Sequence, residues 1–115
     1  MVEWFKLADL SHFFDEEGDH AGEMETSIMM YYFPELVLPL AEAGNGFARK
    51  FKLPGLQNKT AWAPRHWTKV TDDTGVGNPK KASEQKGWVY LQEITGRISD
   101  YLVELNNCDL NDLYG

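Results

Sequence analysis

Three side chains suited to proton transfer, those of His20, Glu23 and Glu25, lie within residues 20–27, which read HAGEMETS. An imidazole or a carboxylate held in place can pass a proton to or from a reacting group near neutral pH. The residues alone also allow a plainer interpretation. In it, His20 satisfies a backbone group where a helix begins, Glu23 is a solvated acid of the first turn, and Glu25 only complements the helix dipole.

An apolar helix is predicted to hold these groups on a rigid base. Residues 28–33 (IMMYYF) are too apolar to face water, so they must pack against a core. The helix should run from about Gly22 to about Phe33, because Pro34 cannot continue a helix without the loss of a hydrogen bond. Gly22 also lets another stretch of backbone come close to the start of the helix.

A second and longer helix is predicted at the C-terminal end of the chain. Asn78 can be its N-cap and Pro79 its first residue, and the helix should continue to about Asn106. Gly87 and Gly96 are unfavourable inside a helix, so we expect another element to pack closely against both. The predicted buried stripe repeats every three or four residues and consists of Trp88, Leu91, Thr95, Ile98, Leu102 and Leu105.

The remaining segments are predicted to be short or irregular. Residues 34–77 contain closely spaced Pro and Gly and should be mostly loop, with a short strand at residues 67–71 where aromatic and β-branched side chains gather. Residues 2–4 fit the end of a strand, residues 7–14 a short helical turn, and the acidic residues 15–19 a solvated loop.

Composition narrows the class of protein. A chain of 115 residues suits one domain, and its 43% hydrophobic content is ordinary for a globular protein. No apolar run is long enough to span a bilayer, and a net charge of -7 repels phosphate backbones, so neither a membrane nor a nucleic acid is an expected partner. Cys108 alone cannot form a disulfide framework and no signal-peptide pattern is present, which predicts a cytoplasmic location.

Two motifs of this chain resemble the creatininase family of metal-dependent amidohydrolases. The first is residues 20–27, followed by the apolar helix and residues 34–37 (PELV). The second is residues 74–79 (TGVGNP), followed by the short motifs AS and KG within residues 82–87, and it is similar to the Gly-Val-x-Gly-x-Pro turn that leads into the last helix of family members. The motifs stand in the family's order and cover the C-terminal half of a family member.

The resemblance implies an α/β fold with a central sheet between layers of helices. Only part of that sheet can come from this chain, so we expect a partial α/β/α sandwich with a long C-terminal helix. Residues 1–115 would then form one creatininase-like portion of a domain, the C-terminal half without the N-terminal half. Family members assemble as hexamers, which makes a homo-oligomer the expected assembly.

The resemblance also implies roles for three residues. His20 matches the histidine that exchanges a proton with the amide nitrogen as the bond breaks, and Glu25 matches the motif's second carboxylate, which holds the histidine or lines the centre. Glu17 matches an acidic contact to the substrate. Glu16 stands where the characterised member has a tryptophan that covers its substrate, and this difference argues against creatinine itself as the substrate.

Metal ions are the cofactors that the resemblance implies, zinc foremost and manganese or iron as alternatives. Most family ligands lie in an N-terminal half with a Glu-x-His-Gly element, which this chain lacks, and no two of His12, His20 and His66 have the i, i+4 spacing of a helical metal pair. We therefore assign no metal ligand here and expect the ions to be bound mainly by residues absent from this chain.

Two hypotheses about function remain open from the sequence. In the first, the chain is the C-terminal part of a hydrolase that uses a metal-activated water to cleave a C–N amide bond in a small molecule, either a cyclic amide or a formamide. In the second, it is a non-catalytic fragment or assembly half that needs an N-terminal partner to form the site.

Overall fold

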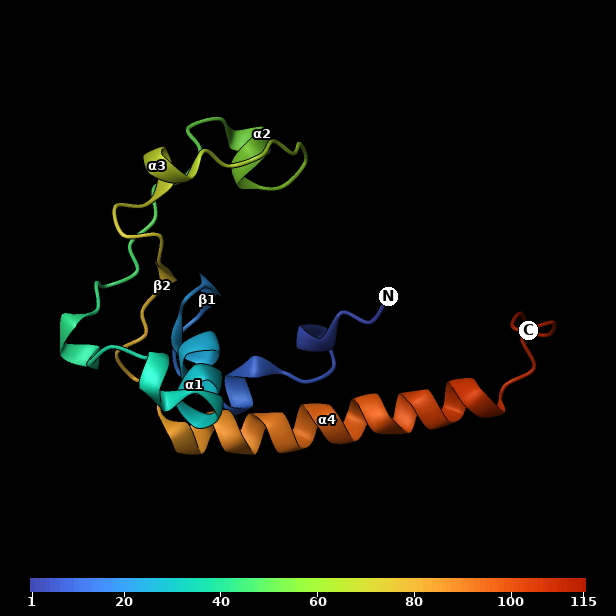
Figure 1. Cartoon of the computed structure of the whole chain (residues 1–115). Helices are drawn as coiled ribbons and strands as arrows, with labels where there is room; N and C mark the ends of the chain where they lie inside the picture. Colours follow the sequence, from blue (N-terminus) through green and yellow to red (C-terminus); the bar gives the residue numbers. More distant parts are fainter.

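A long helix, α4 (Glu84–Asn107), crosses a shorter one, α1 (Glu23–Tyr32), and this pair forms the body of the protein (Figure 1). The computed structural model describes all 115 residues. The fold is a mixture of helix and sheet with a long C-terminal helix, as predicted. The other elements are short, and they are β1 (Gly18–His20), β2 (Val76–Gly77), α2 (Pro54–Gln57), α3 (Trp67–Val70) and the 3-10 helices Trp4–Lys6, Leu10–His12, Pro34–Leu36 and Leu40–Glu42.

Helix α1 has the predicted bounds to within one residue. Gly22 is its N-cap, and Tyr32 is its last residue because the chain turns at Phe33 into the 3-10 helix that begins with Pro34. Its buried residues, Glu23 and Ser27, are four positions apart and so lie on one face. That face is polar and packs against the first turns of α4. Only apolar side chains were predicted to pack this helix against the core.

Helix α4 begins five residues later than predicted. Its N-cap is Ser83, whose side-chain oxygen accepts a hydrogen bond of 3.2 Å from the Lys86 N–H. The Ser83 N–H donates in turn to the Ser27 hydroxyl at 3.1 Å, which ties the start of α4 to α1. The side chain of Asn78 accepts a 3.1 Å bond from the Lys80 N–H, so it stabilises a turn before the helix and does not cap it.

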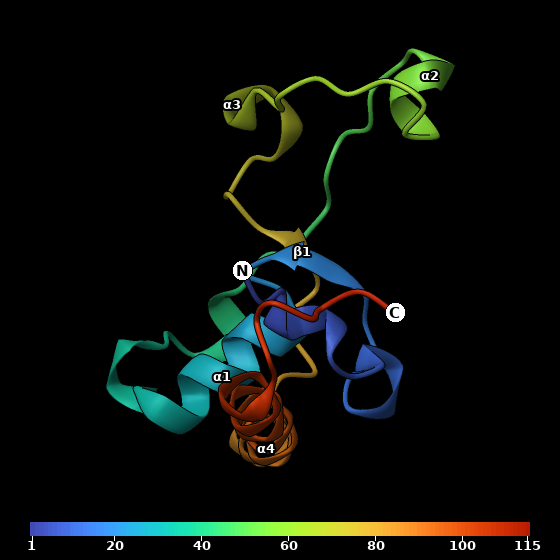
Figure 2. The ribbon, with the colours of Figure 1, turned by 90° about the vertical axis from the view of Figure 1, so that its right-hand side faces the viewer.

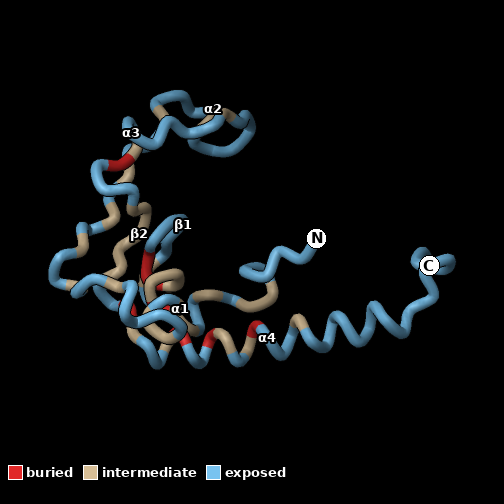
Figure 3. Tube along the Cα trace, in the orientation of Figure 1, coloured by how far each residue is buried: buried red, intermediate tan, exposed pale blue.

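The buried stripe of α4 was predicted only in part, since Ile98 packs against the core and Leu91 is partly buried, as expected. Gly87, Tyr90 and Ile94 are buried, whereas Trp88, Leu102 and Leu105 are 43%, 53% and 43% exposed. The face is rotated by one residue, or about 100° around the helix, because α1 crosses α4 at Gly87. Figure 3 shows that burial is confined to the N-terminal part of α4 and that the C-terminal part is exposed.

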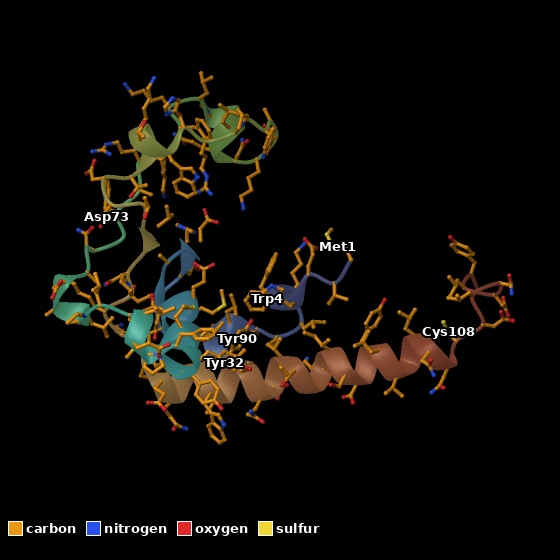
Figure 4. All side chains as sticks on the ribbon, viewed as in Figure 1. Met1, Trp4, Tyr32, Asp73, Tyr90 and Cys108 are labelled. Carbon is orange, nitrogen blue, oxygen red and sulfur yellow. The ribbon has the colours of Figure 1, made fainter.

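Tyr90 is the centre of a small aromatic core. Its ring meets Phe13 and Phe14 edge to face, with centroids 5.2 Å and 5.1 Å away, and Trp4 covers it at 6.2 Å. Figure 4 labels Trp4 and Tyr90 between the N-terminal segment and α4. Burial raises the pKa of Tyr90, and its hydroxyl makes no hydrogen bond. The core thus joins residues near the N-terminus to α4.

Three local predictions were wrong. Residues 2–4 form no strand, and a 3-10 helix covers Trp4–Lys6. The predicted strand at residues 67–71 is helix α3, because no neighbouring strand is there to pair with and β-propensity depends on such pairing. The acidic residues 15–19 are not wholly loop, since β1 begins at Gly18 and pairs with β2 in a two-stranded antiparallel sheet.

Residues 43–71, which we call the arm, extend away from the body and carry α2 and α3 (Figure 1). The view turned by 90° shows the same separation (Figure 2). Most of the arm forms no regular secondary structure, as predicted for this segment. None of the helices is both long enough and apolar enough to cross a membrane.

Gly87 and Gly96 provide a matched test of the α1–α4 crossing. A methyl group on Gly87 would lie 2.0 Å from the Ser27 carbonyl oxygen, whereas nothing lies within 4 Å of the same position on Gly96. The close approach predicted for both glycines is therefore confirmed at Gly87 and wrong at Gly96. We predict that Gly87→Ala lowers the free energy of unfolding by about 1–3 kcal/mol, while Gly96→Ala raises it by roughly 0.5–1 kcal/mol.

Urea unfolding followed by circular dichroism measures both changes. Equal effects from the two substitutions would show that α1 does not cross α4 at Gly87.

Candidate functional site

The two sequence motifs meet at a junction of glycines. Strands β1 and β2 pair Gly18 with Gly77 and His20 with Val76. A side chain on Gly77 would come within 2.6 Å of the Gly18 Cα, and the residue has a φ of +125°, a backbone conformation suited to glycine. Gly22, at the start of α1, is also close to Gly18, since a side chain on Gly22 would come within 3.2 Å of the Gly18 Cα. The glycines of both motifs therefore fix the backbone that carries His20.

His20 lies exposed at the end of β1, beside the arm. Its ring is 5.3 Å from that of Trp67, at a tilt of 47°. The guanidinium of Arg65 lies over the Trp67 ring, 4.7 Å from its centroid, and forms an ion pair with Asp19. Trp67 is therefore a neighbour of the candidate imidazole that was not predicted from the sequence.

Glu25 holds the backbone next to His20. Its carboxylate accepts a hydrogen bond from the Ala21 N–H, the peptide that directly follows His20. Ala21 has a φ of 51°, which non-glycine residues adopt only when their surroundings enforce it. No hydrogen bond joins Glu25 to the imidazole. The Glu25 carboxylate thus contacts the peptide group that follows His20 and not the imidazole itself.

Glu17 and Glu25 line a common hollow of about 490 Å³. His20 is not among the residues that line it, although its neighbour Asp19 is. The structure therefore brings two of the three candidate residues to one hollow and places the third beside it. Carboxylates dominate the polar lining, and they are Asp9, Asp15, Glu16, Glu17, Asp19 and Glu25.

Glu23 is a structural residue whose importance the sequence analysis missed. It is fully buried, so the prediction of a solvated acid was wrong. Its carboxylate accepts hydrogen bonds from the backbone N–H groups of Asp15 and Glu16, at 2.9 Å and 2.7 Å, and forms an ion pair with Lys86. Glu23 thereby holds the loop that places Glu17 at the hollow. One indication of this burial was present in the sequence, the spacing of four residues that places Glu23 and Ser27 on the same face of α1.

Lys86, in the first turn of α4, makes two further contacts besides its ion pair with Glu23. Its ammonium also donates to the Asp15 carboxylate at 2.9 Å and to the Lys81 carbonyl at 3.2 Å. Hydrogen bonds to Asp15 and Glu23 raise the pKa of Lys86, and the bond to Lys86 lowers the pKa of Asp15. Both shifts favour the ion pair over its separated partners.

The pKa shifts set the pH range in which this contact stabilises the fold. The Lys86 contribution is complete below the pKa of an unfolded lysine and is lost as the pH rises through the raised pKa of the folded state. The Asp15 contribution is complete above the pKa of an unfolded aspartate and is lost as the pH falls through the lowered folded value. The loop is therefore held at neutral pH.

The potential metal-ligating side chains of this chain lie apart from one another. No group of three or more His, Cys, Asp or Glu side chains converges in the way that a metal ion requires. Apart from His20, the histidines lie elsewhere, with His12 next to Asp9 at 3.9 Å and His66 bonded to the Thr68 hydroxyl at 3.1 Å. The acidic hollow therefore supplies carboxylates without the geometry of a bound ion.

Comparisons with known proteins agree on one family. The family model described as creatinine amidohydrolase (Creatininase) matches residues 1–102. The chain is also similar to the crystal structure of a protein from Bacteroides fragilis NCTC 9343 that bears the provisional name creatinine amidohydrolase, with 47% sequence identity and a TM-score of 0.86. The match covers 95% of this chain and 43% of that protein, so the chain spans less than half of its length. No curated protein matches the chain.

Removal of the Glu23 charge should loosen the loop at the hollow. We predict that Glu23→Gln lowers the free energy of unfolding by about 1–3 kcal/mol, because two backbone N–H groups and Lys86 lose their charged acceptor. Glu35→Gln is the control, since Glu35 is exposed and makes no ion pair. Urea unfolding at neutral pH measures the difference, and an equal midpoint for the two variants would contradict the structural role of Glu23.

Proposed function

The chain belongs to the creatininase family, and we propose that it forms part of an amidohydrolase that cleaves a C–N amide bond in a small molecule, a cyclic amide or a formamide. The observation that carries this proposal is the family match over residues 1–102, together with 47% identity to a solved structure of the same fold. Because the chain spans 43% of that protein, the activity proposed is that of the complete enzyme.

His20 is the residue that we assign to proton transfer. As the C–N bond breaks, the departing nitrogen must gain a proton, and an imidazole can deliver it near neutral pH. Three features support the choice: the side chain is exposed, the glycine junction fixes its backbone, and Trp67 packs against its ring. A proton donor that is held in place but open to a substrate has the properties that this step needs.

Glu25 and Glu17 are assigned to position the donor and to contact the substrate. Glu25 acts on His20 through the Ala21 peptide, so it is a positioning residue. Glu17 lines the acidic hollow, where carboxylates accept hydrogen bonds from N–H groups. A substrate with several N–H donors or a positive charge would fit this lining better than an anion.

Metal ions belong to the proposal as cofactors of the complete enzyme. The family is generally metal-dependent, and zinc, or manganese or iron in its place, is the ion that we propose. Because no ligand group converges in this chain, we propose that the part of the enzyme outside it supplies the metal ligands. No step assigned here to His20, Glu25 or Glu17 depends on a metal held by this chain.

The second candidate function is that of an assembly half that becomes catalytic only with an N-terminal partner. The sheet has two short strands, and the C-terminal part of α4 leaves apolar side chains exposed. An N-terminal half could add strands to the sheet, in a partial α/β/α sandwich, and could cover these side chains of α4. A homo-oligomer, by resemblance a hexamer, is proposed for the complete enzyme.

We predict that the chain alone binds zinc weakly, because it cannot surround an ion with the roughly four ligands that zinc prefers. Isothermal titration with zinc at neutral pH should show no stoichiometric high-affinity site. His20→Ala is the control for adventitious binding at the exposed imidazole. A tight one-to-one site in the parent chain would mean that the ligand set is complete after all.

In the complete enzyme, we predict that His20→Ala lowers kcat by about 10²–10⁴ without loss of bound metal. Glu25→Gln should cost less, and the double variant should be little worse than His20→Ala, because residues that act as one unit are not additive. Steady-state rates on cyclic amides and N-formyl compounds, with elemental analysis of each variant, test this. His12→Ala is the control, since His12 is exposed and does not line the hollow.

Loss of metal in His20→Ala would make His20 a ligand in place of a proton donor, and full activity would leave it with a structural role only.

A further inference from the structure

The charges of this acidic protein are segregated. The arm, residues 43–71, contains six of the eleven Lys and Arg residues and no Asp or Glu. The other residues have five Lys and Arg against all 18 Asp and Glu. A net charge of -7 therefore hides a strongly basic arm on a strongly acidic body.

The six basic side chains of the arm all line one hollow of about 700 Å³, which we call the cationic hollow. No Asp or Glu lines it, whereas the acidic hollow beside His20 is lined by six carboxylates and by no Lys or Arg. A hollow of this volume is within the range of pockets that hold small molecules. Its basic lining consists of Arg49, Lys50, Lys52, Lys59, Arg65 and Lys69.

The four lysines of the cationic hollow have no counter-charge within the chain. Arg49 and Arg65 form ion pairs with Asp72 and Asp19, whereas none of the lysines forms one. Like charges that line one concave surface add their potentials and attract ions of the opposite sign. An anion bound among the lysines would therefore supply the charge that the chain itself does not.

The cationic hollow also has an apolar wall. Phe51 and Leu56 line it from one side of the arm, and Val70 and Val76 from the other. An inorganic anion could use only the ammonium groups, whereas an organic anion could also bury an apolar ring against this wall. The lining therefore favours a ligand that is anionic at one end and apolar at the other.

The backbone of the arm frames the cationic hollow. The Arg49 N–H donates to the Val70 carbonyl at 2.7 Å, and the Gln57 side-chain amide donates to the Phe51 carbonyl. Lys59 has a φ of 63°, which a glycine would adopt without strain. Strain of this kind is typical of positions where a side chain serves a ligand. The frame thus places one of the lysines at a cost in stability.

The acidic body favours a small ligand over a polyanion. Arg65 lines the cationic hollow, and its ion-pair partner Asp19 lines the acidic hollow. Negative surface therefore begins at the edge of the cationic hollow. A nucleic acid or an anionic bilayer would extend onto this surface and be repelled, whereas a compact anion stays among the lysines.

We propose that the cationic hollow is a binding site for a small organic anion, an aromatic ring that bears a carboxylate or a phosphate group. The lysine ammonium groups contact the anionic group, and Phe51 and Leu56 contact the ring. This inference adds a second binding site to the molecule, and it does not depend on the chemistry proposed for His20.

Titration of the chain with phenyl phosphate, and separately with benzoate, tests the proposal in amide NMR spectra. At least one of the two should give saturable shifts that are largest within residues 48–76, with a Kd that rises as salt is added. Inorganic phosphate should bind more weakly because it has no ring. Benzylamine, which has a ring of the same size and a positive charge, should not bind.

Two sets of variants separate the parts of the site. Lys52→Gln/Lys69→Gln should raise the Kd for phenyl phosphate by about 3- to 30-fold, because two exposed positive charges are lost. Lys6→Gln/Lys80→Gln makes the same charge change outside the arm and should leave this Kd unchanged. Phe51→Ala should weaken phenyl phosphate but not inorganic phosphate. Circular dichroism of each variant confirms that it is folded.

Several results would overturn the proposal. One is the absence of saturable shifts in the arm with both aromatic anions, and another is an equal Kd for the two lysine pairs of variants. Binding of benzylamine at the same residues would show that the positive charge selects nothing. Tighter binding of single-stranded oligo(dT) than of phenyl phosphate would assign the arm to a polyanion in place of a small ligand.

Discussion

The buried carboxylate of Glu23 joins three separate parts of the chain. It accepts hydrogen bonds from the backbone at Asp15 and Glu16, and Lys86 of α4 pairs with it across the crossing of the two helices. Burial of a charge is costly unless its oxygens find donors, so the helix crossing and the acidic loop stabilise each other through this carboxylate. Asp15 and Glu16, which it holds, line the same hollow as Glu17 and Glu25.

The second constraint is the close packing of glycines between the motifs. A Cβ atom on Gly77 would lie 2.6 Å from the Gly18 Cα, and one on Gly22 would lie 3.2 Å from the same atom. Gly87 in turn allows α1 to lie directly on α4. These contacts explain why residues far apart in the sequence define one site. They position His20 by the backbone, while Glu25 completes the same task from the first turn of α1. The site is thus built from backbone geometry before any side chain contributes chemistry.

A structural feature could be predicted from the sequence when residues next to it in the chain determine it. The bounds of α1 follow from Gly22 and Pro34, which act on their neighbours, and they were predicted correctly. The buried face of α4 depends on where α1 crosses it, and the burial of Glu23 depends on Lys86, so neither could be read from periodicity. In the site, the choice of His20, Glu25 and Glu17 comes from the family resemblance and stays a prediction, whereas the contact of His20 with Trp67 arises from the path of the arm.

The arm reaches back to the body beside the candidate proton donor. Arg65 and Trp67 belong to the arm, yet they contact Asp19 and His20 of β1. The Gly77 N–H also donates to the Gly46 carbonyl at 3.0 Å, which ties the start of the arm to β2. The path of the arm, which no local sequence pattern determines, therefore decides which side chains lie against the imidazole of His20.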